Sequence, residues 1–269
     1  MPGPTGAADA AAAAAAADAA AIGARWREVR ARVDDAARRA GRAPEAVTLV
    51  AVSKTQPAAA VEAAWAAGAR DFGENYAQEL RDKAGATHAP GARWHFIGRL
   101  QTNKARLVVG IAQVVETVDS ARLLEAVAAR VRGLTRAPGA PRSEGGTPVA
   151  QDVLIQVNVG DEPQKGGVPD GALAALLDQA LAEARVRVLG LMAIPPAVDT
   201  AEAARPYFAR LRALRDREAA RTGAALAELS MGMSADFEAA VAEGATRVRV
   251  GTAIFGARPA PPAREGGGA

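Results

Sequence analysis

The chain has 269 residues, 49% of them hydrophobic, which is enough for one large domain or two small ones with a sizeable core. Its formal net charge of +3 arises from 33 Lys+Arg against 30 Asp+Glu, interleaved along the chain without a dense basic run. We therefore expect no nucleic-acid partner. The absence of cysteine excludes disulfides, thiolate metal sites and cysteine nucleophiles.

The chain begins with a low-complexity alanine tract, residues 1–22. Asp9 and Asp18 interrupt this tract and no basic segment precedes it, so it does not resemble a signal peptide. Since alanine favours helix, we expect the tract to extend the helix predicted over Ala21–Ala40, which Gly41 ends. No window has the length and hydrophobicity of a membrane span, which favours a cytoplasmic protein without a membrane partner.

From residue 47 onward, short β-rich runs alternate with helical patterns. The predicted strands are Val47–Val52, Ala69–Phe72, Arg93–Ile97, Val114–Thr117, Val153–Val159, Val186–Met192, Glu228–Ser230 and Thr246–Val250. The predicted helices between them are Pro57–Ala67, Tyr76–Ala84, Asn103–Val109, Ser120–Val131, Pro169–Glu183, Thr200–Arg221 and Ala235–Glu243. Eight such units predict an α/β fold, a single (β/α)8 TIM barrel with an extra N-terminal helix. An open doubly wound sheet is the alternative, but no G-x-G-x-x-G motif follows the first strand.

We expect one barrel domain over residues 23–258. The alanine-rich extension 1–22 precedes it, and a Pro/Gly-rich, disordered tail follows at 259–269. Residues 137–148, with their Pro, Gly and Ser, are predicted to form a surface loop.

Lysine is rare in this arginine-rich chain, with only four among the 33 basic residues, namely Lys54, Lys83, Lys104 and Lys165. Lys54 closes the first predicted strand, so it stands at the strand's carboxyl end, where barrel enzymes place their chemistry. A lysine, unlike an arginine, can lose its proton and form a Schiff base. The alternative is that Lys54 only covers apolar surface or pairs with an acid.

Two glycine-containing segments follow the seventh and eighth predicted strands. The sequence Ser-Met-Gly-Met-Ser, ending at Ser234, leads into a helix that Ser234 or Asp236 could cap. Gly251 and Thr252 add a backbone N–H and a hydroxyl, and a phosphate site after these two strands is a recurring use of the barrel. Ordinary helix capping and a tight turn are the alternatives. With Lys54 on the opposite side of the mouth, the set suits a phosphorylated aldehyde such as pyridoxal 5′-phosphate.

Six ordered motifs resemble one known family. They are Ala51–Thr55, Phe72–Tyr76, Trp94–Gly98, Gly190–Pro195, Leu229–Ser234 and Val248–Gly256. They resemble the YggS/PROSC family of pyridoxal phosphate homeostasis proteins, over residues 22 to 258. The resemblance implies a barrel like the N-terminal domain of bacterial alanine racemase. It also implies that Lys54 holds the cofactor as an internal aldimine.

The resemblance assigns further cofactor-binding roles. Ser234, Gly251 and Thr252 would hold the phosphate. Arg249 would face the pyridine nitrogen, and Asn75 and Met192 would line the ring pocket.

The expected activity follows from Arg249 and from the tyrosines. An arginine against the pyridine nitrogen leaves that nitrogen unprotonated and the ring a poorer electron sink. Alanine racemases also use a tyrosine from a second domain, which we do not expect here, and this chain has only Tyr76 and Tyr207. We therefore expect a non-catalytic, monomeric pyridoxal phosphate carrier that can serve PLP-dependent apoenzymes. The alternative is a PLP-dependent amino-acid racemase of low activity.

The remaining titratable candidates predict no metal site. His88 and His95 are the only histidines, too few for a three-histidine zinc site, and no acid cluster has calcium-loop spacing. We expect His88 in a surface loop and His95 as a hydrogen-bonded core residue. Glu74 can be either catalytic or a structural hydrogen-bonding group.

Overall fold

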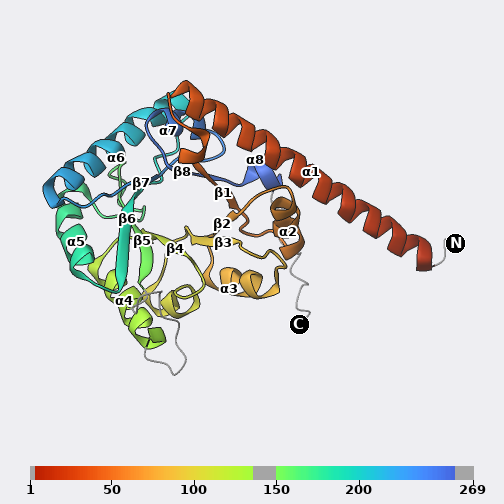
Figure 1. Ribbon diagram of the computed structural model, residues 1–269, viewed down its shortest axis with the longest axis horizontal. Helices are drawn as coiled ribbons and strands as arrows, with labels where there is room; N and C mark the ends of the chain where they lie inside the picture. The colour runs from red at the N-terminus through yellow and green to blue at the C-terminus, as the bar shows by residue number, and fades with distance from the viewer. Residues whose placement is uncertain (1–3, 136–149, 258–269) are drawn as a thin grey trace, which may run out of the picture.

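The computed structural model describes residues 4–135 and 150–257, and these fold around a closed ring of eight parallel strands (Figure 1). Strand order follows the sequence, and β1 pairs with β8 to close the ring. The strands are β1 Thr48–Val52, β2 Asp71–Glu74, β3 Arg93–Phe96, β4 Val114–Val118, β5 Gln151–Gln156, β6 Val186–Met192, β7 Glu228–Ser230 and β8 Arg247–Val250. The predicted (β/α)8 barrel is confirmed.

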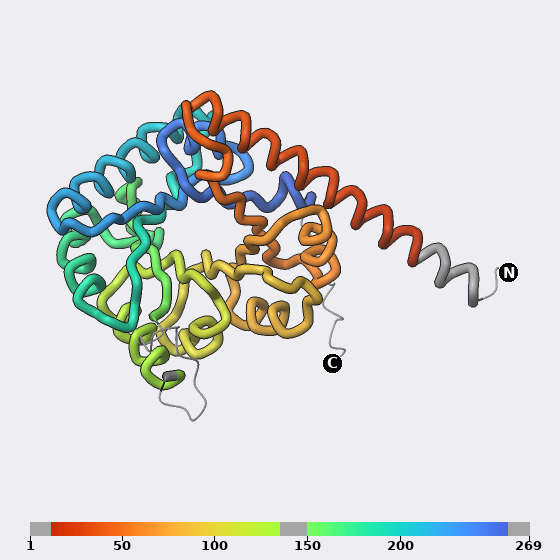
Figure 2. Tube along the Cα trace, viewed as in Figure 1, coloured from red at the N-terminus to blue at the C-terminus, as the bar shows by residue number. Residues whose placement is uncertain are grey.

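The helices lie outside this ring, as a parallel sheet with apolar strands requires. They are α1 Pro4–Arg39, α2 Ala58–Ala66, α3 Ala77–Ala86, α4 Ala121–Thr135, α5 Asp170–Ala182, α6 Ala201–Thr222, α7 Phe237–Ala242 and α8 Thr252–Phe255, with 3₁₀ turns η1 Pro44–Ala46 and η2 Thr102–Leu107. The extra helix α1 packs on α2, α7 and α8, and the red part of its trace projects beyond the barrel (Figure 2).

The second strand and the third helix need correction, and one helix was missed. The second strand runs over Asp71–Glu74, not Ala69–Phe72, because its register is set by pairing with β1 and β3, which the local pattern does not contain. The helix predicted at Asn103–Val109 is the short 3₁₀ segment η2, and α8 was not predicted. The predicted loop 137–148 and tail 259–269 lie outside the described residues, and the domain boundaries stay predictions.

The core has two parts. The larger one lies between strands and helices and includes the fully buried Phe72, Phe208 and Phe237. A smaller cluster of Val114, Leu154 and Met192 is separate from it. In the described parts of the chain, no helix is long and apolar enough to cross a membrane.

Candidate functional site: the carboxyl ends of strands β1, β7 and β8

Lys54 lies two residues after the end of β1, in the turn that leads to α2, and is half-buried. Its neighbour Thr55 has a φ of 63°, a left-handed conformation that β-branched residues seldom adopt. Such a conformation costs about 1–3 kcal/mol and persists where surrounding contacts fix it. The backbone N–H of Thr55 donates to Glu79 Oε1 at 2.6 Å, and that of Ser53 donates to Gly73 O at 3.0 Å. The backbone on both sides of Lys54 is therefore tied down.

The predicted phosphate-binding residues follow the carboxyl ends of β7 and β8. Ser234 is half-buried in the loop after β7, and Thr252 is the exposed first residue of α8. Their hydroxyl oxygens are 3.2 Å apart, with Thr252 donating to Ser234. Gly251 lies against the end of β1, because a Cβ at this position would be 3.3 Å from Val52 O. We call Ser234, Gly251 and Thr252 the hydroxyl cradle.

The prediction that Lys54 and the cradle lie on opposite sides of the mouth is wrong. Strands β1 and β8 pair in parallel, with Val50 beside Arg249. Because closing the ring makes the first and last strands neighbours, Lys54 and Gly251 stand on adjacent strand ends. This proximity suits a single small ligand better than the predicted arrangement does.

Arg249 is a buried residue of β8 beside the cradle. Its backbone N–H donates to Gly232 O at 3.0 Å, which ties β8 to the loop after β7. Its Nη1 donates to Ser230 Oγ at 2.7 Å, and its Nη2 donates to Ala193 O at 2.9 Å. Burial lowers the pKa of Arg249, although the negative charge of Glu116 opposes this effect. A guanidinium nonetheless keeps its proton at physiological pH, so its donors are permanent.

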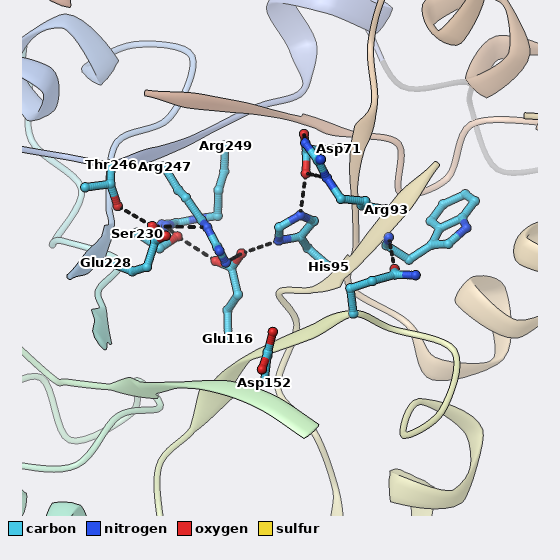
Figure 3. Close-up of polar contacts among 12 residues, drawn as sticks. Asp71, Arg93, His95, Glu116, Asp152, Glu228, Ser230, Thr246, Arg247 and Arg249 are labelled. Atoms are coloured by element: carbon cyan, nitrogen blue, oxygen red, sulfur yellow. Dashed lines mark hydrogen bonds and ion pairs between the residues drawn. The ribbon is translucent and has the colours of Figure 1, made fainter. Parts of the chain in front are cut away.

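Behind this guanidinium, a chain of polar contacts crosses the barrel interior (Figure 3). Ser230 Oγ donates to Glu116 Oε2 at 2.5 Å, and Glu116 Oε1 is 2.7 Å from His95 Nδ1. His95 Nε2 is 3.0 Å from Asp71 Oδ1. Arg93 donates to both oxygens of Asp71, at 2.8 and 2.5 Å. The chain thus runs from the amino end of β2 and β3 to the carboxyl end of β7.

The protonation of this chain is set by two carboxylates that flank one imidazole. Burial acts to lower the pKa of His95, but hydrogen bonds to Asp71 and Glu116 raise it above its usual 6.5. Burial acts to raise the pKa of Glu116, but the hydrogen bond and charge of His95 lower it to about 2. The pKa of Asp71 is also lowered to about 2, because hydrogen bonds from His95 and Arg93 outweigh burial. Both ring nitrogens of His95 face a carboxylate, an arrangement that favours the imidazolium form, and the prediction of a hydrogen-bonded core histidine is confirmed.

Asn75 and Met192, the two predicted ring-pocket residues, differ in access. Asn75 follows β2, and its Oδ1 is buried without a hydrogen-bond partner among the residues that the structure describes. Met192 ends β6 and is completely buried against Val114 and Leu154. Asn75 thus has an acceptor available for a ligand, whereas Met192 contributes only the apolar packing beneath.

The buried polar chain was missed, although the sequence carries a signal for it. Glu116 stands in the otherwise apolar or hydroxyl-bearing β4, and a carboxylate in a buried strand needs a partner. One partner, His95, comes from the neighbouring strand β3, and the other, Ser230, comes from β7, which only the closure of the ring brings near. No group of three or more His, Asp or Glu side chains able to hold a metal ion occurs within residues 4–135 and 150–257.

Comparison with known proteins places this barrel in a family. A family model described as alanine racemase, N-terminal domain, matches residues 18–259. The "Pyridoxal phosphate homeostasis protein" of Aquifex aeolicus is 41% identical over 227 residues, covering 84% of this chain and 94% of its own length. The Pseudomonas aeruginosa protein of the same name is 44% identical over 231 residues, covering 86% and 93%.

A solved structure agrees with these relatives. PipY of Synechococcus elongatus, solved with PLP bound, matches with a TM-score of 0.73 and 37% identity, covering 87% of this chain and 100% of that one. The resemblance predicted from six motifs is confirmed. This chain belongs to the family of pyridoxal phosphate homeostasis proteins, whose barrel is the alanine racemase N-terminal domain.

Proposed function

We propose that this protein binds pyridoxal 5′-phosphate at the barrel mouth and takes part in PLP homeostasis. The observation that carries the proposal is the adjacency of Lys54 after β1 to the hydroxyl pair Ser234 and Thr252 after β7 and β8. The relatives' name and the PLP bound to PipY support it.

The side chains present fit the polar groups of this cofactor. The cradle offers the Thr252 hydroxyl at the start of α8 and, 3.2 Å away, the Ser234 hydroxyl in the loop before α7, which suits a phosphate. The buried Asn75 Oδ1 has no hydrogen-bond partner in the described part of the chain, so it can accept from the ligand. The guanidinium of Arg249, which Ser230 and Ala193 hold in place, is the group that would face the pyridine nitrogen. When bound, the cofactor supplies an aldehyde and an electron-withdrawing ring.

Lys54 is the residue that we expect to bond covalently to the ligand. Its nitrogen would form a bond to the aldehyde carbon while the carbonyl oxygen leaves as water. The other lysines are less suited to this reaction. Lys83 is buried against Glu74 and Glu79, and Lys165 donates to Pro195 O. Covalent attachment at Lys54 would limit the free reactive aldehyde in the cell.

The environment of the site favours a carrier over a racemase. An arginine does not give up its proton to a ring nitrogen, so a nitrogen facing Arg249 stays unprotonated and the ring withdraws electrons weakly. Tyr207 packs against the core from α6. Tyr76 is 58% exposed at the start of α3. Recipient apoenzymes, the monomeric state and the cytoplasmic location stay predictions.

Proton exchange distinguishes the carrier from the racemase. We would incubate the protein and pyridoxal 5′-phosphate with L-alanine in D2O and follow the α-proton by NMR, with Lys54→Ala as the matched control. The carrier proposal predicts no exchange above the rate of the control. Exchange at enzymatic rates with both enantiomers formed would instead establish the racemase.

A further inference from the structure

Lys83 is a buried lysine on α3 that connects to the backbone on both sides of Lys54. We propose that Lys83, acting through Glu74 and Glu79, is a positioning residue that sets the place and direction of Lys54. The inference rests on the proposed function, since it assigns a second lysine to the same site.

The first connection runs to Ser53, the residue before Lys54. Lys83 Nζ donates to the carbonyl oxygen of Ser53 and, at 2.8 Å, to Glu74 Oε1. Ser53 Oγ donates to the same Glu74 oxygen at 2.7 Å. Ser53 and Glu74 are completely buried. The residue before Lys54 is therefore held through both its backbone and its side chain.

The second connection runs to Thr55, the residue after Lys54. Lys83 Nζ is 2.7 Å from Glu79 Oε1, and the same oxygen accepts the backbone N–H of Thr55 at 2.6 Å. Thr55 is the residue in the left-handed conformation, with a φ of 63°. An unfavourable backbone conformation persists where neighbouring contacts over-determine it, and such positions cluster at ligand sites. Lys83 thus fixes the acceptor that holds this turn.

The geometry explains why the position carries lysine in a chain that otherwise favours arginine. A single ammonium nitrogen donates to Ser53 O and Glu74 Oε1 and forms an ion pair with Glu79 Oε1, so that three oxygens surround one point. A planar guanidinium spreads its donors over a fork and does not gather three oxygens around one atom. Glu74 Oε2 has no hydrogen-bond partner within the described residues, so removal of Lys83 leaves Ser53 as the remaining partner of this buried carboxyl.

The test uses two ligands that differ only at the reacting carbon. Pyridoxal 5′-phosphate can bond to Lys54, whereas pyridoxine 5′-phosphate has an alcohol in place of the aldehyde and cannot. Affinities for both would be measured for wild type, Lys83→Met, Lys83→Arg and Lys104→Met. Lys104→Met is the matched control, because Lys104 is exposed on η2.

We expect Lys83→Met to weaken the binding of pyridoxal 5′-phosphate by about tenfold or more, since small misplacements of a reacting group are costly. Pyridoxine 5′-phosphate binding should stay unchanged, Lys83→Arg should restore the affinity only in part, and Lys104→Met should match wild type. Equal affinities in wild type and Lys83→Met, or a parallel loss of both ligands, would overturn the positioning role. If Lys83→Met does not fold, Glu79→Gln, at a partly exposed side chain, is tested with the same expectations.

A readout without cofactor separates this inference from the proposed function. If wild type binds the two ligands equally well, the covalent role of Lys54 is wrong whatever Lys83 does. Amide hydrogen exchange of Thr55 then decides the positioning role. Lys83→Met should speed this exchange by about tenfold or more, because the N–H loses its fixed acceptor. Unchanged exchange in the folded variant would refute it.

Discussion

Thr252 Oγ1 donates a hydrogen bond to Ser234 Oγ at 3.2 Å, although the two residues follow different strands of the barrel. The contact joins the start of α8 to the loop between β7 and α7. It places two hydroxyls and the backbone of Gly251 next to the end of β1, where Lys54 follows. A phosphate that enters this place replaces one hydroxyl–hydroxyl contact with charge-assisted hydrogen bonds.

Substitutions in the cradle should therefore weaken phosphate recognition specifically. A hydrogen bond to a charged group contributes about 1.5–3 kcal/mol, so Ser234→Ala and Thr252→Ala should each weaken pyridoxal 5′-phosphate about 10- to 100-fold. The affinity for pyridoxal, which lacks the phosphate, should change little in these variants. Spectroscopic titration of both ligands measures the difference.

The control for these variants is Thr222→Ala, at the end of α6, where the hydroxyl donates to Glu218 O. Its affinity for both ligands should match that of wild type. An equal loss of pyridoxal and pyridoxal 5′-phosphate in the cradle variants would show that the hydroxyls do not bind the phosphate.

The buried polar chain should make the protein less stable both at acidic pH and at pH above the histidine range. The pKa of Glu116 is lowered from 4.5 to about 2 and that of Asp71 from 3.8 to about 2. The contribution of these two carboxylates to the free energy of unfolding is complete above pH 4.5 and is lost as the pH falls toward 2. The pKa of His95 is raised above 6.5, so its contribution is complete below pH 6.5 and is lost as pH rises through the raised value. The chain therefore stabilises the fold most between pH 4.5 and 6.5.

Glu116→Gln isolates this effect. Removing one partner of a buried charge pair costs about 3–5 kcal/mol, because His95 and Arg249 lose the anion between them. The difference in unfolding free energy between wild type and Glu116→Gln should be largest between pH 4.5 and 6.5 and should shrink outside that range. Denaturant unfolding at several pH values measures it. A difference that does not vary with pH would contradict the assigned protonation states.

The barrel was predictable from sequence because each strand carries its own apolar signal. β6 and β7 begin and end where the pattern predicts, since local composition is sufficient there. β2 does not, because the strand extends through Gly73 and Glu74, residues that neighbouring strands recruit into the sheet. Residues at strand ends, such as Lys54 and Ser234, could be named as candidates because a barrel fold predicts which positions face the mouth.

Contacts across the barrel were not predictable in the same way. Ser230 and Glu116 are 114 positions apart, and their contact depends on closure of the ring. The adjacency of Lys54 and Gly251 also follows from closure. The pairing of Lys83 with Glu79, one helical turn apart, is a local spacing that could have been noticed. Its connection to Ser53 could not, because it requires α3 to pack over the end of β1.

Covalent trapping on Lys54 tests the central claim most directly. The protein is incubated with pyridoxal 5′-phosphate, treated with borohydride to reduce any bond between lysine and ligand, digested, and examined by peptide mass spectrometry. We predict that the peptide containing Lys54 carries the reduced adduct, and that Lys54→Ala carries none at any lysine under the same conditions. An unmodified Lys54 peptide in wild type, or a main adduct on Lys83, Lys104 or Lys165, would contradict the account.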